Sequence, residues 1–446
     1  MTQQPLSARA AGPLRGRLAV PGDKSISHRA LILSSLAAGE SHIAGLLQSD
    51  DILATAEALS RLGAVITHLP DGRVRVLGRG LGGLTPPQGE LDFGNSGTGA
   101  RLMMGVVAGQ DIAARFIGDA SLSTRPMGRV LEPLALMGAR TEPEGRTHLP
   151  LTLHGSEMPV PITYQVPVPS AQVKSALLLA GLSSPGRTTI TEARPTRDHT
   201  ERMLAIYGAA ITVTELESGG RRIELQGEAE LNPQDITVPG DPSSAAFPAV
   251  AALITPGSDI TLENVMINPD RNGLFVTLEE MGADIEYIPR ESRAGEQIAD
   301  LHLSFSHLHG VDVPAGRAPS MIDEYPVLAV AAAFAEGDSW LRGLSELRVK
   351  ESDRLAAITA GLAANGVDFE LHGDDLLVRG RRRAGIPGGG RVKTHMDHRI
   401  AMAFLVMGLA SEKPVIVDDG AMIATSFPDF SGLMRRLGAA IDHEET

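Results

Sequence analysis

The chain has 446 residues, of which 43% are hydrophobic and 21% charged, proportions typical of soluble globular proteins, and its length suggests roughly three domains. Its net charge of −14 disfavours sequence-independent binding to nucleic acid or anionic lipid, and the lack of cysteine excludes disulfides, thiolate metal sites and a thiol nucleophile. The longest apolar runs, 327–335 and 400–407, are about half a membrane span, so we expect a cytoplasmic protein without a membrane partner.

One kind of segment recurs along the chain: small and polar residues, an apolar stretch of helical length, and then a turn. The copies are Asp23–Gly39, Gly94–Gly109, Pro169–Gly181, Pro242–Ile254, Ile322–Ala335 and Asp397–Ala410. They follow one another at intervals of about 75 residues, which indicates six internal structural repeats. Because the helices are apolar on nearly all sides, we expect them to be buried.

Each repeat also contains a second helix, which ends in Gly-Ala or Gly-Val about 40 residues after the start of the first segment. The glycines are Gly63, Gly138, Gly208, Gly282, Gly366 and Gly438. Glycine suits the left-handed residue that ends a helix, and the alternating sequence beyond it predicts a strand with one solvated face. Each repeat is therefore predicted to hold two helices and several strands, an α/β fold.

The tetrapeptide Val-Pro-Gly-Asp occurs at 20–23 and again at 238–241, just before the first and fourth repeated helices. We interpret these stretches as the places where the chain crosses between two lobes. Residues 23–238 then form the lobe of repeats one to three, and residues 1–22 and 239–446 form the lobe of repeats four to six. Two crossovers at one hinge would permit opening and closing, although an ordinary turn used twice is the alternative.

The starts of the six apolar helices hold most of the residues that are unusual for an apolar helix. They include Lys24, Ser25, Arg29, Gly97, Ser170, Gln172, Ser243, Asp323, His398 and Arg399. A buried helix offers unpaired N–H groups and a positive dipole end at its start, so starts that converge on one cleft would bind anions. Structural N-caps explain serine and aspartate but not cations, which oppose the dipole. The pattern predicts a phosphorylated or carboxylated substrate.

Further cations are Arg125, Arg197 and the pair Lys350 and Arg354, which share a face with Glu351 if that segment is helical. Asp323 and Glu351 are candidates for a general acid and base on opposite sides of a cleft. For residues 347–354, a solvated ion-paired face is the alternative. The segment 78–83 matches a dinucleotide motif but runs into prolines instead of a helix, and His395 to His398 lack further metal ligands.

Four motifs closely resemble the 5-enolpyruvylshikimate-3-phosphate (EPSP) synthase family, in particular its branch known for glyphosate-tolerant members. They are PGDKSISHRA at Pro21–Ala30, GNSGTGAR at Gly94–Arg101, LRVKESDR at Leu347–Arg354 and DHR at Asp397–Arg399. The resemblance implies two lobes of three repeats, each packed as an inverse α/β barrel with buried helices. It also implies a shikimate-pathway reaction in an inter-lobe cleft: the enolpyruvyl group of phosphoenolpyruvate is transferred to the 5-hydroxyl of shikimate-3-phosphate, and phosphate is released.

The resemblance also implies the site residues. Those expected to hold shikimate-3-phosphate are Lys24, Ser25, Arg29, Ser170, Ala171, Gln172, Arg197, Asp323 and Lys350. Those expected to hold phosphoenolpyruvate are Lys24, Gly97, Arg125, Gln172, Glu351, Arg354 and Arg399. Asp323 and Glu351 are implied in proton transfer, and Lys24 in stabilising developing charge. We expect no metal or organic cofactor, a monomer, and glyphosate as an inhibitor.

Two positions depart from the family pattern. Many members place a lysine just before Thr-Phe-Pro near the C-terminus, whereas this chain has Ala424-Thr-Ser-Phe-Pro428, so one phosphoenolpyruvate contact is missing or supplied differently. Gly97 stands where the best-known tolerant members carry alanine, and we therefore expect stronger inhibition by glyphosate.

Three other functions remain as alternatives. The related transferase that acts on UDP-N-acetylglucosamine usually uses a cysteine, which this chain lacks. A non-catalytic anion-binding protein would not need Asp323, Lys350 and Glu351. An RNA-processing enzyme with related repeats is disfavoured by the negative net charge and by an aromatic content of only 3%.

Overall fold

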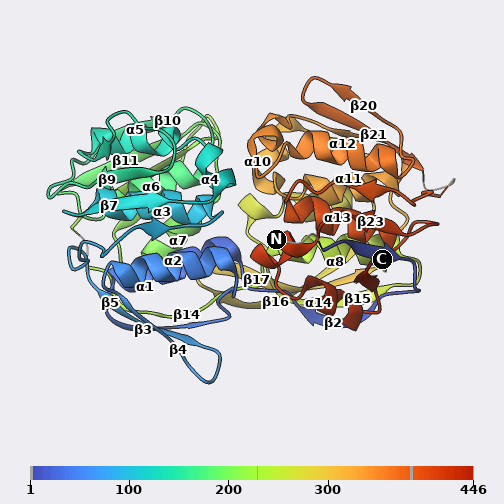
Figure 1. The fold of residues 1–446 in the computed structure, drawn as a ribbon, viewed down its shortest axis with the longest axis horizontal. Helices are drawn as coiled ribbons and strands as arrows, with labels where there is room; N and C mark the ends of the chain where they lie inside the picture. Colours follow the sequence, from blue (N-terminus) through green and yellow to red (C-terminus); the bar gives the residue numbers. More distant parts are fainter. Residues whose placement is uncertain (1–3, 229, 382–384, 445–446) are drawn as a thin grey trace. The chain divides into compact units, whose positions relative to one another are not determined.

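The computed structural model describes residues 4–228, 230–381 and 385–444 (Figure 1). The chain forms two compact units, which we call unit 1 (Met1–Pro21, Gly240–Glu291 and Gln297–Thr446) and unit 2 (Gly22–Pro239 and Ser292–Glu296). The chain passes from unit 1 to unit 2 between Pro21 and Gly22, and back to unit 1 between Pro239 and Gly240. Each of these points lies between the proline and the glycine of a Val-Pro-Gly-Asp segment.

Unit 2 contains three four-stranded sheets in the described part of the chain. Their orders are β14(Asp235–Thr237)-β3(Ala38–Ala44)-β5(Val74–Arg79)-β4(Val65–His68), β6(Leu91–Asp92)-β7(Ala113–Ile117)-β9(Leu151–His154)-β8(Arg140–Glu142) and β10(Thr163–Val166)-β11(Arg187–Glu192)-β13(Arg221–Gln226)-β12(Ile211–Glu215). In each order the first pair is parallel and the second antiparallel.

Unit 1 repeats this pattern over its described residues. Its orders are β2(Arg15–Ala19)-β15(Asp259–Met266)-β17(Glu296–Ser304)-β16(Asp284–Arg293), β18(Asp312–Val313)-β19(Glu336–Leu341)-β21(Asp375–Arg381)-β20(Phe369–His372) and β22(Arg391–Val392)-β23(Val415–Val417)-β1(Leu6–Arg9)-β24(Ala440–His443). Again the first pair is parallel and the second antiparallel. The same topology in every sheet confirms the repeat structure predicted from the sequence.

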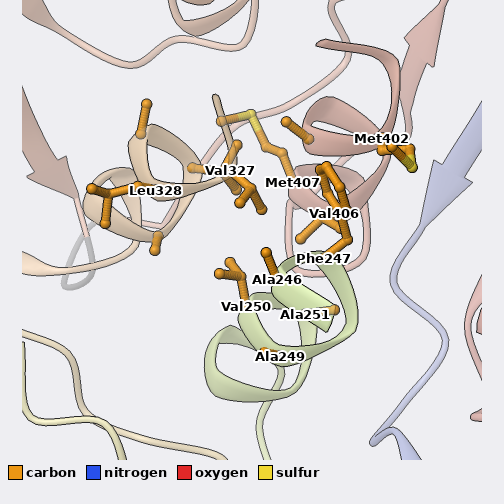
Figure 2. Packing of buried hydrophobic residues seen from close by; sticks show 14 of the residues in the cluster. Ala246, Phe247, Ala249, Val250, Ala251, Val327, Leu328, Met402, Val406 and Met407 are labelled. Atoms are coloured by element: carbon orange, nitrogen blue, oxygen red, sulfur yellow. The ribbon is translucent and has the colours of Figure 1, made fainter. Parts of the chain in front are cut away.

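Each repeat also contributes one helix to the interior of its unit. These inner helices are α1(Lys24–Leu36), α3(Gly97–Ala108) and α6(Ala171–Gly181) in unit 2, and α8(Pro242–Ile254), α11(Tyr325–Ala333) and α13(His398–Gly408) in unit 1. In unit 1, Val250, Val327 and Met407 point from the three helices toward one another (Figure 2). In unit 2, a Cβ on Gly105 of α3 would lie 2.4 Å from the carbonyl oxygen of Ala176 in α6, so glycine permits the close approach of these helices.

The second helix of each repeat is only partly buried. These helices are α2(Asp50–Arg61), α5(Gly128–Leu136), α7(His199–Ile206), α9(Gly273–Glu280), α12(Arg354–Ala364) and α14(Phe430–Arg436). The glycine that follows each of them has a positive φ, between 75° and 106°, as the sequence predicted. Shorter helical segments are α4(Ala120–Thr124), α10(Ala318–Met321), η1(Pro269–Arg271), η2(Ala315–Arg317), η3(Ser345–Val349) and η4(Ala421–Thr425). The expected α/β fold of two lobes, each an inverse barrel of three repeats around buried helices, is confirmed.

One short segment departs from the expected lobes. Residues Ser292–Glu296, where β16 turns into β17, belong to unit 2 although the surrounding chain belongs to unit 1. The reason is a set of contacts with α7: Arg202 donates to the carbonyl oxygen of Gly295 at 3.2 Å, and His199 Nδ1 lies 2.7 Å from Glu296 Oε1. Contacts between segments this far apart in the sequence leave no local pattern that would predict them.

Candidate active site

Four of the six inner helices are accessible, and only near their starts. The half-buried residues of these helices, all of which are described, are Lys24 and Ser25 in α1, Thr98 and Arg101 in α3, Ala171 and Gln172 in α6, and Arg399 in α13. Every residue of α8 and α11 is buried, and half-buried Asp323 lies two residues before α11. Unit 2 therefore presents the positive ends of its three inner helices, and unit 1 presents that of α13, together with polar side chains.

In unit 2, the start of α1 carries two expected cations. Asp23 caps the helix by accepting a hydrogen bond from the Ile26 N–H at 2.7 Å, and Lys24 forms an ion pair with Asp51. The Arg29 side chain is buried, and burial is the largest effect that lowers its pKa to about 10. Arg29 nevertheless remains a cation near pH 7.

Arg29 connects three segments of unit 2. Its Nη1 donates to the carbonyl oxygen of Ser25 at 2.9 Å, its Nη2 to Ser175 at 2.8 Å and its Nε to Thr200 at 2.6 Å. The charge of Arg197 also acts on Arg29, so these two expected residues lie near each other. Arg29 thus joins α1, α6 and α7, beside the loop that carries Arg197.

The starts of α3 and α6 are joined by Gln172. Its Nε2 donates to Thr98 Oγ1 at 2.9 Å, and its Oε1 accepts from Arg101 Nη1 at 3.0 Å. Ser170 caps α6 by accepting from the Val173 N–H at 3.4 Å. The expected residues Gly97 and Ala171 are the first residues of these two helices.

Arg125 lies at the end of α4, close to the start of α3. Its Nη2 donates to Asn95 Oδ1 at 2.6 Å and to Ser121 Oγ at 3.1 Å. A Cβ placed on Gly97 would lie 3.4 Å from Arg125 Nη1. Arg125 therefore adds a cation beside the N-terminus of α3. We call the expected residues of unit 2 the unit 2 half-site. They are Lys24, Ser25, Arg29, Gly97, Arg125, Ser170, Ala171, Gln172 and Arg197.

His28 lies beneath the unit 2 half-site and adds no charge to it. The side chain is buried, and its Nδ1 lies 2.8 Å from Thr55 Oγ1. Burial, together with the charges of Lys24 and Arg29, lowers the pKa of His28 well below its ordinary value. The imidazole is therefore neutral at pH 7.

In unit 1, Arg354 joins the two candidate proton-transfer groups. Its Nη1 donates to Asp323 Oδ1 at 3.1 Å and its Nη2 to Glu351 Oε2 at 2.5 Å. Lys350 Nζ lies 3.3 Å from the same Asp323 oxygen. Asp323, Lys350, Glu351 and Arg354, together with Arg399, form the unit 1 half-site.

Asp397 supports this cluster from below. It caps α13 by accepting from the Arg399 N–H at 3.0 Å, and it accepts from Arg354 Nε at 2.8 Å. Burial alone would lower the pKa of Arg354, but the carboxylates of Asp397, Glu351 and Asp323 raise it above its ordinary value. Burial alone would raise the pKa of Asp397, but Arg354 holds it below its ordinary value. The two side chains are thus an ionised pair.

Arg399 is held along one edge of its guanidinium. Nη1 donates to the carbonyl oxygen of Asp323 at 3.2 Å and lies 3.4 Å from Glu324 Oε1. Within the described chain, Nε and Nη2 donate to no protein group, and the side chain is 13% exposed. A planar fork of N–H groups in this state suits a carboxylate or a phosphate.

Comparison with known proteins agrees with this arrangement. The family model of EPSP synthase (3-phosphoshikimate 1-carboxyvinyltransferase) matches residues 8–434. The chain belongs to the EPSP synthase family. It is 60% identical over 444 residues to the 3-phosphoshikimate 1-carboxyvinyltransferase of Methylorubrum populi, covering 98% of this chain and 97% of that protein. A relative of the same name from Methylobacterium sp. is 61% identical, with 98% of both chains covered.

Solved structures of EPSP synthases have the same fold. An EPSP synthase from Acinetobacter baumannii is 41% identical, with a TM-score of 0.88 over 99% of this chain and all of that one. A second structure from the same organism has a TM-score of 0.87 at 39% identity. The family resemblance inferred from four motifs is thereby confirmed, as is a 3-phosphoshikimate carboxyvinyltransferase activity. The transferase for UDP-N-acetylglucosamine is not favoured.

Lys174 lies near the site but belongs to none of the four family motifs. It is fully buried, and its Nζ lies 2.8 Å from Glu192 and 2.7 Å from Glu201. These contacts fasten the chain on either side of Arg197 to α6. A lysine inside the apolar run 173–180 is the sequence signal of such a buried ion pair.

Membrane spans and metal ligands were also considered from the sequence, and the described residues bear on both. None of the helices in the described residues has the length and apolar composition needed to cross a membrane. The group found with metal-ligand spacing among the described residues is Asp198, His199 and Glu296, not the segment His395 to His398. Arg202 lies 2.7 Å from Asp198 and 3.8 Å from Glu296, so a fixed cation already accompanies these carboxylates.

Proposed function

We propose that the unit 2 and unit 1 half-sites bind the substrates of the EPSP synthase reaction and take part in one catalytic cycle. In this proposal shikimate-3-phosphate is bound by Lys24, Ser25, Arg29, Ser170, Ala171, Gln172, Arg197, Asp323 and Lys350. Phosphoenolpyruvate is bound by Lys24, Gly97, Arg125, Gln172, Glu351, Arg354 and Arg399.

The observation that carries the proposal is that the accessible residues of α1, α3, α6 and α13 all lie at or near the starts of these inner helices. Both substrates bear a phosphate and a carboxylate, and a helix start supplies N–H donors and a positive dipole end to such groups. Each half-site adds fixed cations, for example Arg125 in unit 2 and Arg399 in unit 1. This explains how a chain with a net charge of −14 binds two anions.

In the proposed mechanism, the 5-hydroxyl group of shikimate-3-phosphate loses its proton and its oxygen bonds to C2 of phosphoenolpyruvate, while the methylene carbon C3 accepts a proton. The tetrahedral adduct then loses a C3 proton and phosphate, which restores the double bond as an enol ether. Asp323 and Glu351 are the proposed proton carriers, and their contacts with Arg354 fix both carboxylates in place. Lys24 stabilises the charge that develops in the transition state.

The first test measures phosphate release from the two substrates with one arginine removed from each half-site. We expect Arg125→Ala and Arg399→Ala each to raise the KM for phosphoenolpyruvate by about 10- to 100-fold, because charge-assisted hydrogen bonds to charged groups contribute about 1.5–3 kcal/mol. Exposed Arg436, paired with Asp429, provides the control variant Arg436→Ala. An unchanged KM in either active-site variant would contradict the proposed role of that arginine.

Gly97 is the basis of a prediction about glyphosate, which is longer than phosphoenolpyruvate. A Cβ at this position would lie 3.0 Å from Arg101 Nη1 and 3.4 Å from Arg125 Nη1, so a methyl group would crowd the surrounding guanidinium groups. We expect Gly97→Ala to raise the inhibition constant of glyphosate at least about tenfold, the effect of about 1.4 kcal/mol. A wild-type inhibition constant no lower than that of the variant would contradict the prediction.

The two Val-Pro-Gly-Asp segments are the proposed hinge of the chain. Backbone hydrogen bonds from Asp23 N to Pro239 O at 2.7 Å and from Asp241 N to Pro21 O at 2.9 Å support their pairing.

The proposal also includes a monomeric state and a cytoplasmic location, in keeping with the acidic, cysteine-free sequence.

A further inference from the structure

Glu324 is a buried carboxylate that directly follows Asp323. Its side chain is 4% exposed, and its backbone lies at the N-cap position of α11. One oxygen, Oε1, accepts a short hydrogen bond from Ser243 Oγ of α8 and lies 3.4 Å from Nη1 of Arg399 in α13. A single carboxylate oxygen therefore joins the starts of all three inner helices of unit 1.

On the Ser243 side, this connection is held by buried polar groups. Arg271, whose side chain is 4% exposed, donates through Nη2 to Ser243 Oγ at 2.8 Å and to Asp241 Oδ1 at 2.9 Å. Asp241 in turn caps α8 by accepting from the Ser243 N–H at 3.0 Å. Glu324 is thus fixed from behind by buried groups with their own partners.

On the other side of Glu324, Arg399 is the partner that is partly exposed. Only Nη1 of Arg399 contacts Glu324 and the carbonyl oxygen of Asp323, so the N–H groups on its other edge have no acceptor within the described chain. Without Glu324, this long side chain would keep one neutral backbone acceptor and could rotate about its terminal bonds. Glu324 supplies the charged contact that selects one orientation of the guanidinium plane.

A purely structural role explains this residue poorly. Burying a carboxylate is costly, and an apolar side chain of similar size often gives equal or greater stability. A carboxylate would also repel the phosphate and carboxylate groups of the substrates, so Glu324 is not itself a substrate ligand. Its contact with Arg399 explains why a carboxylate is needed at this position.

We propose that Glu324 is a positioning residue for the reaction: it holds Arg399 in the orientation that binds phosphoenolpyruvate. This inference rests on the proposed function of Arg399. Because the carboxylate acts through Arg399, its loss weakens the binding of phosphoenolpyruvate and leaves the binding of shikimate-3-phosphate nearly unchanged.

The test compares Glu324→Ala and Glu324→Gln in steady-state kinetics with each substrate varied. We expect Glu324→Ala to raise the KM for phosphoenolpyruvate about 10- to 100-fold, since misplacing a binding group by about 1 Å can cost that much. Glu324→Gln keeps an acceptor oxygen but no charge, and we expect a rise of about three- to tenfold. The KM for shikimate-3-phosphate is expected to change less than about twofold in both. Asp300→Ala, which removes another carboxylate with 3% exposure in unit 1, is the matched control and should leave the KM for phosphoenolpyruvate unchanged.

Variants in an Arg399→Ala background separate the two proposals. There, Glu324→Ala is expected to add less than a twofold change, because its target is gone. If Arg399→Ala raises the KM but folded Glu324→Ala does not, the positioning role is wrong and the function of Arg399 stands. If Arg399→Ala itself has no effect, the proposed site fails and the positioning role with it. Should Glu324→Ala not fold, an unchanged KM in Glu324→Gln overturns the inference.

Discussion

Replacement of Lys24 by alanine is expected to lower kcat by about 10²- to 10³-fold, the usual cost of removing one fixed group that stabilises transition-state charge. Lys24 is the first residue of α1, its side chain is 24% exposed, and its ammonium is held by Asp51. The variant should still fold, because the helix keeps its Asp23 cap and its buried apolar residues. Phosphate release and circular dichroism measure the two properties separately.

The control for Lys24 is a lysine with no proposed role. Exposed Lys413 provides it, and Lys413→Ala should retain full activity. Lys24→Arg restores the charge on a larger, planar group, and we expect only partial recovery because an ammonium is a compact point charge. Activity of folded Lys24→Ala equal to that of the wild type would speak against the proposed site in unit 2.

The repeats could be predicted from the sequence because their signals are local. A polar cap followed by an apolar run marks each inner helix: α1 begins at Lys24 directly after its cap Asp23, and α13 begins at His398 after Asp397. A glycine after each outer helix has the positive φ that its sequence position predicts. The same pattern predicts Lys24, Gly97 and Arg399 near helix starts, and the family resemblance then implies their roles.

The sheet closures could not be predicted, since they pair distant segments. Strand β1 lies between β23 and β24, with Leu6 opposite both Val417 and His443, and β14 pairs with β3 through Ile236 and Ile43. Such registers depend on the packing of the whole unit and not on local propensity.

The roles of buried residues that support the site could not be predicted from the sequence either. Glu324 reads as a polar neighbour of Asp323 in the apolar context of α11, and its burial and its contact with Ser243 emerge only in three dimensions. Arg354 was expected as a ligand residue, and the structure adds its contact with the fully buried Asp397.

Removal of Arg354 is expected to have the largest effect on stability. In Arg354→Leu, Asp397 would remain buried without its cation, and Asp323 and Glu351 would lose their common partner. Breaking a buried ion pair by removing one side costs about 3–5 kcal/mol of unfolding free energy. We also expect activity to fall by at least about 10²-fold, because both proposed proton carriers lose their fixed positions. Thermal unfolding and phosphate release are the measurements.

Two further variants distinguish charge from geometry at Arg354. Arg354→Lys keeps a positive charge but cannot span three carboxylates, so it should recover stability better than activity. Arg354→Leu combined with Asp397→Asn removes both charges and should be more stable than Arg354→Leu alone. An unchanged melting temperature in Arg354→Leu would contradict the role assigned to this arginine.

The difference in unfolding free energy between the wild type and Arg354→Leu should change with pH in a defined direction. Burial alone would raise the pKa of Asp397, but Arg354 lowers it below the ordinary value of 3.8, so the folded wild type binds this proton less readily than the unfolded chain does. The stability that Asp397 contributes is therefore fully present above the unfolded pKa and is lost as pH falls toward the folded pKa. Without Arg354, burial raises the pKa of Asp397, and the carboxyl group becomes neutral at a higher pH. The stability gap between the wild type and Arg354→Leu should accordingly narrow as pH falls from neutrality toward the acid range, whereas a gap that widens would mean that Asp397 does not depend on Arg354 for its charge.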